Sequence, residues 1–344
     1  GAEFAQQFPK IAARLRMEGL EVADPYVERL LEGFAFLAAR VQLKLDAEFP
    51  RFTQRLIEIV HPHFLTPMPS MLVAQLQPEQ GDAGLAAGPV VPRGSVLRAR
   101  PMRPGATECR FRTAHDVQLA PLEITAAEYF SHASSLPLTA VPQWRKFGGG
   151  VRLTLRTTAG VDFSQLRLED LRLHLAGVDE VAYRLHELVC GQVLGGFVLA
   201  GRGTAARHEL LPADIVQPVG FDDEHALLPS THRGFDGYRL LQEYFAFPQR
   251  FLFFDLAGVG PALRRLGGKE LDIVLLFARG DGTLQQTVDA GAFALHCVPA
   301  INLFEKRCDR VHVSPQSSDF HVDADRARPL DFEVFELLEV TGYG

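Results

Sequence analysis

Histidines beside an acidic residue are the side chains in this sequence that could do metal chemistry. The stretch HELVC, from His186 to Cys190, matches only the first half of the zinc-protease pattern HExxH. That pattern needs a second histidine four residues after the first, because both imidazoles must reach the metal from one helix face. His61 and His63 are also close together, but Pro62 places them at an expected helix end, where the helix dipole alone favours histidine. We therefore expect no metal and no cofactor at either place.

A run of carboxylates offers the other route to chemistry. Asp222, Asp223 and Glu224 lie within FDDEHALLP and could assist proton transfer or bind a cation. No base, nucleophile elbow or phosphate-binding glycine loop accompanies them in the sequence. A solvated acidic loop is the simpler interpretation, and we expect no catalytic residue. The alternative that remains open is an enzyme of unknown class that uses this loop or the pair His186 and Glu187.

The overall composition excludes several classes of function. The 344 residues include 35 basic and 42 acidic side chains, so the formal net charge is -7. Nucleic-acid binding relies on clustered Lys and Arg, which are not evident here. The longest apolar runs are far shorter than the roughly 20 residues that span a bilayer, so we expect no direct membrane insertion. Four scattered cysteines without a paired spacing indicate reduced thiols and a cytoplasmic location.

The first 66 residues have a helical pattern. Asp24 and Pro25 are a favourable helix start, and we expect this helix to reach about Glu48, where Phe49-Pro50 would end it. A further helix is expected from Pro50 to about Val60. The long helix has one wide apolar stripe that should face its own core; its residues are Val27, Leu30, Leu31, Phe34, Leu37, Ala38, Val41 and Leu45.

The opposite side of that helix is unusual for its apolar residues. Phe36 and Leu43 lie there, seven residues apart, among the polar side chains of Arg29, Glu32 and Arg40. Something must cover this second face. Either another part of the same chain or a partner helix could do so.

The periodicity changes to two after residue 66, and the fold class is therefore predicted to be α+β. We expect a helical N-terminal arm (1–66), a β-rich, sandwich- or barrel-like middle domain (67–213) with one inserted helix near Asp179–Val189, and a mixed α/β domain (214–344). Expected strands are MLVAQLQ, CRFRTAHDVQL, PLEITAAEYF, VRLTLRT and LRLHLAG, then stretches near Leu271–Ala278 and Leu330–Val340.

The aromatic stretch YRLLQEYFAFPQRFLFFDL could be either a binding platform or a core segment. A platform for nucleic acid would interleave rings with basic groups, and only Arg239 and Arg250 are present. The pattern instead indicates a helix over residues 238–247, a stop at Pro248, and a strand over residues 250–256 that is buried on both faces. The predicted core residues are Leu241, Tyr244, Phe245, Phe247, Phe251, Phe253 and Phe254.

Long stretches, in order along the chain, resemble the TssF (VasA/ImpG) family of type VI secretion baseplate subunits. Family members extend beyond both ends of this sequence, so the resemblance implies a fragment. The stretches that carry the resemblance are FPKIAARL, DPYVERLLEGFAFLAARVQLKLDAEFPRFTQRLIEIVHPHFLTPMPSM, CRFRTAHDVQL, LHELVCGQV, PVGFDDEHALLP, GYRLLQEYFAFPQRFLFFDL and INLFEKR.

The resemblance implies a noncatalytic wedge component, cytoplasmic and docked at the inner-membrane face when assembled. Its implied partners are TssG, a second TssF copy, TssK, TssE and the spike protein VgrG. The implied mechanism is mechanical, because the wedges close around the spike and provide the platform for the tube and the contractile sheath. Within this picture, we expect the face formed by Arg29, Glu32, Phe36, Arg40 and Leu43 to contact TssG or the second TssF copy.

Overall fold

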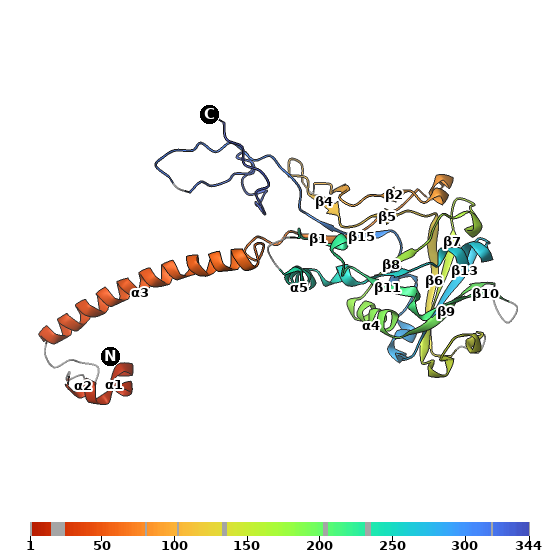
Figure 1. Ribbon diagram of the computed structural model, residues 1–344, viewed down its shortest axis with the longest axis horizontal. Coiled ribbons are helices and arrows are strands. Elements are labelled where there is room, and N and C mark those ends of the chain that lie inside the picture. The colour runs from red at the N-terminus through yellow and green to blue at the C-terminus, as the bar shows by residue number, and fades with distance from the viewer. Residues whose placement is uncertain are drawn as a thin grey trace. The chain divides into compact units, whose positions relative to one another are not determined.

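The computed structural model describes residues 2–14, 25–79, 81–101, 103–132, 136–201, 206–230, 235–317 and 319–343. The chain divides into two compact units, Gly1–Leu65 and Thr66–Gly344, and Figure 1 shows the elements of each. The first boundary therefore falls within one residue of the end expected for the helical region.

The first unit contains the short helices α1 (Ala2–Gln7) and α2 (Pro9–Arg14) and the long helix α3 (Pro25–Val60). α3 begins at a proline, as expected, because proline at the first helical position has no amide hydrogen that would lack a partner. The expected capping residue Asp24 lies outside the described residues. The ring of Phe4 on α1 packs against that of Phe8, which lies between α1 and α2, with the ring centroids 5.3 Å apart.

The predicted helix break at Phe49-Pro50 is wrong, because α3 continues through Pro50 for a total of 36 residues. Proline has no amide hydrogen, so the helix loses one backbone hydrogen bond at this point. The Thr53 hydroxyl, one turn later, donates to the Pro50 carbonyl at 3.0 Å. Phe49 and Pro50 are exposed, so water can reach the backbone carbonyl that the proline leaves without its usual donor. Because this part of α3 is exposed to solvent, the helix can continue through Pro50.

The second unit is built around a five-stranded antiparallel sheet in the order β10-β9-β13-β7-β6. In β7, the inward residues Val151, Leu153 and Leu155 are buried, as the alternating pattern predicts. The strands are β6 (Leu122–Phe130), β7 (Gly149–Thr157), β9 (Val193–Ala200), β10 (Arg207–Leu211) and β13 (Glu270–Phe277).

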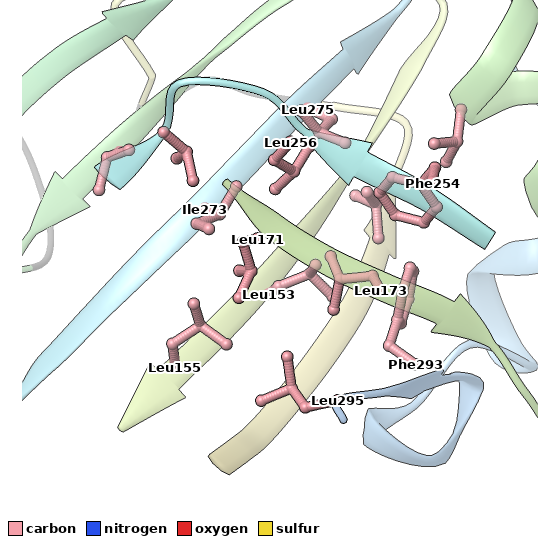
Figure 2. Packing of buried hydrophobic residues seen from close by; sticks show 14 of the residues in the cluster. Leu153, Leu155, Leu171, Leu173, Phe254, Leu256, Ile273, Leu275, Phe293 and Leu295 are labelled. Carbon is pink, nitrogen blue, oxygen red and sulfur yellow. The ribbon is translucent and has the colours of Figure 1, made fainter. Parts of the chain in front are cut away.

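A four-stranded sheet in the order β11-β12-β8-β14 packs on one face of this sheet. Leucine and phenylalanine side chains from β7 and β13 interdigitate with those from β8 and β12, as Figure 2 shows. The predicted α+β class with a sandwich-like β region is thus confirmed. The strands of this second sheet are β8 (Leu171–Leu175), β11 (Val216–Val219), β12 (Phe253–Leu256) and β14 (Phe293–Ala294).

The remaining described strands form a sheet in the order β1-β15-β4-β3 and a two-stranded ladder of β2 and β5. Side chains of β1 and β15 pack against the other face of β12. The bounds are β1 (Met71–Gln75), β2 (Val90–Val91), β3 (Val96–Arg98), β4 (Arg110–Thr113), β5 (Val117–Gln118) and β15 (Cys297–Ile301), and the helices of this unit are α4 (Asp179–Gly191), α5 (Asp236–Ala246) and α6 (Gly260–Leu266).

Two further expectations need correction. The expected boundary near residue 213 does not separate two sheets, because β13 lies between β9 and β7, and β12 pairs with β8. Long-range pairing of this kind leaves no trace in local composition. The strand expected at Leu330–Val340 is not formed, since that stretch has no ladder partner and Leu330 and Val340 are exposed.

Candidate partner-binding surfaces

Helix α3 exposes its main apolar stripe. None of its residues is buried, and Leu30, Phe34 and Leu37 are among its most exposed large side chains. The expectation that this stripe faces its own core is therefore wrong for the chain by itself. The apolar positions continue past Pro50 through Phe52 and Ile59, because the helix does not break there. An amphipathic helix about 54 Å long thus presents an uncovered apolar side.

The second face of α3 is exposed as well. Phe36 is 61% exposed and Leu43 is 68% exposed. The guanidinium of Arg29 pairs with Glu32 at 3.0 Å, and the Arg40 guanidinium lies 5.8 Å from the centroid of the Phe36 ring. Two aliphatic or aromatic anchors surrounded by charges are typical of a protein interface. The five residues predicted for a partner-binding face therefore lie on one side of α3, where they are exposed to solvent.

Helix α5 has the reverse of the usual orientation, since its charged residues face inward. Glu243 is fully buried and Arg239 nearly so. Arg239 forms ion pairs with Asp223, which lies on the neighbouring 3-10 turn Asp223–His225, and with Glu243, at 3.4 Å. The Glu243 carboxylate also accepts a hydrogen bond from the Leu228 amide at 3.0 Å. These contacts attach the inner side of α5 to the turn before it.

Arg250, which follows α5, completes this buried charge cluster. Its guanidinium pairs with Glu243 and donates to the carbonyls of Gly220, at 2.6 Å, and His225, at 3.0 Å. Burial and the neighbouring Arg239 charge lower the pKa of Arg250 to about 10, so it stays protonated at neutral pH. This buried ion cluster was not predicted from the sequence. The spacing of Arg239 and Glu243, four residues apart on one helix side, was the available signal.

The aromatic stretch therefore divides into an exposed and a buried half. Phe251, Phe253 and Phe254 are buried, and Phe247 packs partly covered against a small apolar cluster. The prediction of a core position is wrong for three residues on α5, because the ionic contacts turn their side chains outward. Exposed fractions there are 56% for Leu241, 51% for Tyr244 and 81% for Phe245.

The residues that suggested an enzyme have structural contacts instead. Asp223 pairs with Arg239, and Asp222 lies 3.8 Å from the ring of His225. Glu187 pairs with Arg279 at 2.5 Å on the surface. His186, on α4, is half-buried, and burial lowers its pKa. Asp223 and Glu187 are thus committed to ion pairs with arginines, whereas Glu224 is exposed and forms no ion pair among the described residues.

The described part of the chain contains no group of three or more histidine, cysteine or acidic side chains placed to hold a metal ion. His61 has a lowered pKa, caused by partial burial and by the neighbouring His63. Within the same residues, no helix combines the length and the apolar character needed to cross a bilayer. α3 is long enough, but charged side chains recur along it.

Comparison with known proteins gives consistent matches. The sequence matches the family described as "Type VI secretion system, TssF" over residues 1–344. It is 50% identical over 343 residues to the "Type VI secretion system component TssF1" of Pseudomonas aeruginosa, a match that covers 100% of this chain and 55% of that protein. The chain therefore spans only about half the length of this curated relative.

One solved structure also has a similar fold. A chain of the "type VI secretion system TssK-TssF-TssG baseplate subcomplex" superposes with a TM-score of 0.62 at 30% identity, covering 82% of this chain and 50% of that one. A chain of "the baseplate complex from the type VI secretion system" matches at 29% identity with a TM-score of 0.39, covering 91% of this chain and 51% of that one. The family match over the whole length and the identity of half the residues lead to one conclusion: this chain belongs to the TssF family of type VI secretion systems.

Proposed function

We propose that this chain is a noncatalytic structural component of a type VI secretion baseplate that assembles with TssG and TssK. The observation that carries the proposal is α3, which is 36 residues long, has apolar side chains on two faces and has no buried residue. A helix with this much uncovered apolar surface gains most of its stability from packing against other chains. The related TssF chain was solved in a complex with TssK and TssG, which supports these two partners.

The finer parts of the proposal concern the remaining assembly. We place TssE, the VgrG spike and a second copy of the chain among the partners, in wedges that surround the spike and provide the starting platform for tube and sheath. The location is the cytoplasm, docked at the inner-membrane face when assembled. Its action is mechanical, which fits the use of Asp223 and Glu187 in ion pairs rather than in a shared cleft.

Within this assembly, we assign the second face of α3 to TssG or the second copy. Two exposed anchors, Phe36 and Leu43, lie on this face between Arg29, Glu32 and Arg40. Burying both anchors stabilises a complex, and burying an aspartate in either place costs free energy because its charge would lack a partner. The proposal therefore predicts that charge at these two positions weakens assembly.

The test is co-expression of the chain with TssG and TssK from the same system. The double variant Phe36→Asp with Leu43→Asp should raise the dissociation constant of the complex at least about tenfold. The matched control is Ala35→Asp with Gln42→Asp, which has the same seven-residue spacing on a different side of α3 and should bind nearly as the unchanged chain. Circular dichroism of each isolated variant checks its fold.

Two outcomes would contradict the proposal. If the double variant is unfolded while the control is folded, the second face belongs to the interior of this chain. If both variants bind equally well, the face has no part in assembly. Failure of the unchanged chain to co-purify with either protein would reject the baseplate assignment itself.

A further inference from the structure

The exposed face around α5 is a second apolar surface, separate from α3. It consists of Tyr183 on α4, Phe221 on the preceding loop, and Tyr238, Leu241, Tyr244 and Phe245 on α5, and we call it the α5 face. The ring of Tyr244 contacts those of Phe245, at 5.5 Å, and Phe251, at 5.8 Å, and Phe251 in turn lies 5.2 Å from Phe221. The rings of Phe221, Tyr244 and Phe245 are therefore joined through the buried ring of Phe251.

Buried ion pairs on the opposite side of α5 keep the α5 face exposed to solvent. Arg239 and Glu243 occupy the buried side of the helix and are joined to Asp223 and Arg250. Turning α5 over to bury Leu241 and Phe245 would expose these ion pairs and remove the hydrogen bond to the Leu228 amide. The orientation of the helix, and with it the apolar surface, is thus fixed.

The charges around the α5 face are acidic. Asp179 lies close to Tyr183, whose pKa rises through burial and this neighbouring carboxylate. Glu224 follows Phe221 by three residues and is exposed. Neither acid forms an ion pair in the described residues. Of the cations around them, Arg239 and Arg250 are buried, Arg184 pairs with Asp281 and Glu180, and the exposed Arg93 donates to the Ala226 carbonyl at 3.4 Å. Nucleic acid or an anionic membrane would be repelled, so the charge favours a basic protein segment.

The C-terminal half of α3 has the complementary chemistry. Phe52, Leu56 and Ile59 are exposed and lie on the main apolar stripe. Arg51 and Arg55 flank them one turn apart, and neither forms an ion pair in the part of the chain that the structure describes. At 3.6 residues per turn, the basic side chains of α3 all fall within a sector of roughly 80° beside the stripe; they are Arg29, Arg40, Lys44, Arg51 and Arg55, with Glu58 in the same sector.

We propose that the α5 face binds the C-terminal half of α3 from a second copy of this chain. Phe52, Leu56 and Ile59 pack on the rings of the α5 face, and Arg51 and Arg55 meet Asp179 and Glu224. When each copy supplies one α3 and one α5 face, the two contacts are equivalent, and the proposal is that both form together in a closed dimer. The inference rests on the part of the proposed function in which a second copy takes part, and it leaves Phe36 and Leu43 free for another partner.

The available area suits a contact of modest affinity. Aromatic side chains bury about 150 to 250 Å² each when fully covered, and those of the α5 face are roughly half exposed. The five aromatic side chains and Leu241 therefore bury on the order of 600 Å² on one partner, below the roughly 800 Å² of a standard interface. Two equivalent contacts in a closed dimer double this area. We therefore expect association in the micromolar range.

The test is a charge exchange between two variants of the whole chain. In one, Arg51→Glu and Arg55→Glu make α3 acidic; in the other, Asp179→Lys and Glu224→Lys make the α5 face basic. Each variant alone should dimerise at least about tenfold more weakly than the unchanged chain, because like charges then meet. An equimolar mixture should recover the affinity, since both contacts in the mixed dimer again join opposite charges. Analytical ultracentrifugation measures all three.

A further pair of variants tests the apolar part of the contact. Leu241→Asp with Phe245→Asp should abolish dimerisation of this variant when it is measured alone. These side chains are exposed, so the melting temperature of the variant should stay near that of the unchanged chain. If it falls sharply instead, the single variant Phe245→Ser provides the same test with less disturbance, and it too should weaken dimerisation.

The inference is overturned if the unchanged chain is monomeric at concentrations on the order of 100 µM. It is also overturned if either charge variant dimerises as the unchanged chain does, or if the mixture fails to recover affinity. Co-purification with TssG and TssK is measured separately. Loss of self-association with retained TssG binding rejects only this inference, and the reverse result rejects only the proposed function.

Discussion

Helix α5 and strand β12 come from one aromatic stretch but have opposite surroundings. Phe254 on β12 is fully buried in the main core, whereas Phe245 on α5 is 81% exposed. The strand is paired on both sides, with β11 and β8, and packs on both faces. The helix is instead anchored through Arg239, Glu243 and Arg250. Identical side chains thus have different roles, and the position of the buried charges decides which role each has.

α3 adds a third case to this comparison. It has neither ladder partners nor buried ionic anchors, and none of its residues is buried. β12 is complete within the chain, α5 is fixed within the chain but leaves a surface uncovered, and α3 leaves two faces uncovered. The apolar surface left uncovered within the chain therefore increases from β12 to α5 to α3.

The largest expected effect separates the two halves of the aromatic stretch. Phe254→Ala should lower the free energy of unfolding by about 4 kcal/mol, because it leaves a cavity between the two sheets. The matched variant Phe245→Ala removes the same side chain from the surface and should change this free energy by less than about 0.5 kcal/mol. Urea unfolding measures both. Equal effects of the two substitutions would mean that the Phe245 side chain is buried against the rest of the second unit.

A smaller effect is expected from removing the anchor of α5. Glu243→Gln keeps an acceptor for the Leu228 amide but leaves Arg250 and Arg239 without their buried anion. The free energy of unfolding should fall by about 3 kcal/mol. Glu187→Gln, which affects only the surface pair with Arg279, should cost at most about 0.5 kcal/mol. Stability unchanged by Glu243→Gln would show that the ion cluster does not hold the helix.

The smallest effect concerns the histidines around β12. The ring of His174 lies 4.4 Å from that of Phe253, and burial lowers the pKa of His174 to about 4. The pKa of His115 is also about 4, lowered by burial and by Arg172. Because an unfolded histidine titrates near 6.5, the unfolded chain binds these protons first as the pH falls. The stability present above pH 6.5 should therefore be lost progressively towards pH 4.

Between pH 7 and pH 5, each of these histidines should lower the free energy of unfolding by on the order of 1 to 2 kcal/mol. His174→Gln removes one titrating group while keeping a polar side chain, so its stability should depend less steeply on pH. Urea unfolding at a series of pH values gives the slope of the free energy of unfolding against pH for the variant and for the unchanged chain. Parallel slopes for the variant and the unchanged chain would mean that the pKa of His174 is the same in the folded and the unfolded chain.

Much of the local structure could be predicted from the sequence. The alternation in VRLTLRT identified β7 and its buried residues, and the helical period identified α4 and α5. These signals are local, since a strand or helix repeats its apolar residues with its own period. Phe36 and Leu43, which we propose to bind a partner, were likewise singled out because apolar side chains on a second helix face break that period.

What could not be predicted depends on contacts between distant residues. β13 lies between β7 and β9 although more than a hundred residues separate it from β7, so a domain boundary placed by local composition failed. The outward orientation of α5 depends on Arg250 and Asp223, which lie outside the helix. Hydrophobic patterning alone therefore assigned Leu241, Tyr244 and Phe245 to the core. The continuation of α3 through Pro50 depends on solvent access, which the sequence pattern does not show.

We propose that α3 is covered by other proteins of the baseplate and not by its own chain. Hydrogen exchange of the backbone amides of residues 25–60, measured by mass spectrometry, tests it most directly. In the isolated chain these amides should exchange much faster than those of β13, and assembly with TssG and TssK should slow exchange in α3 while leaving β13 unchanged. Protection of α3 equal to that of β13 in the isolated chain, or no change on assembly, would contradict the claim.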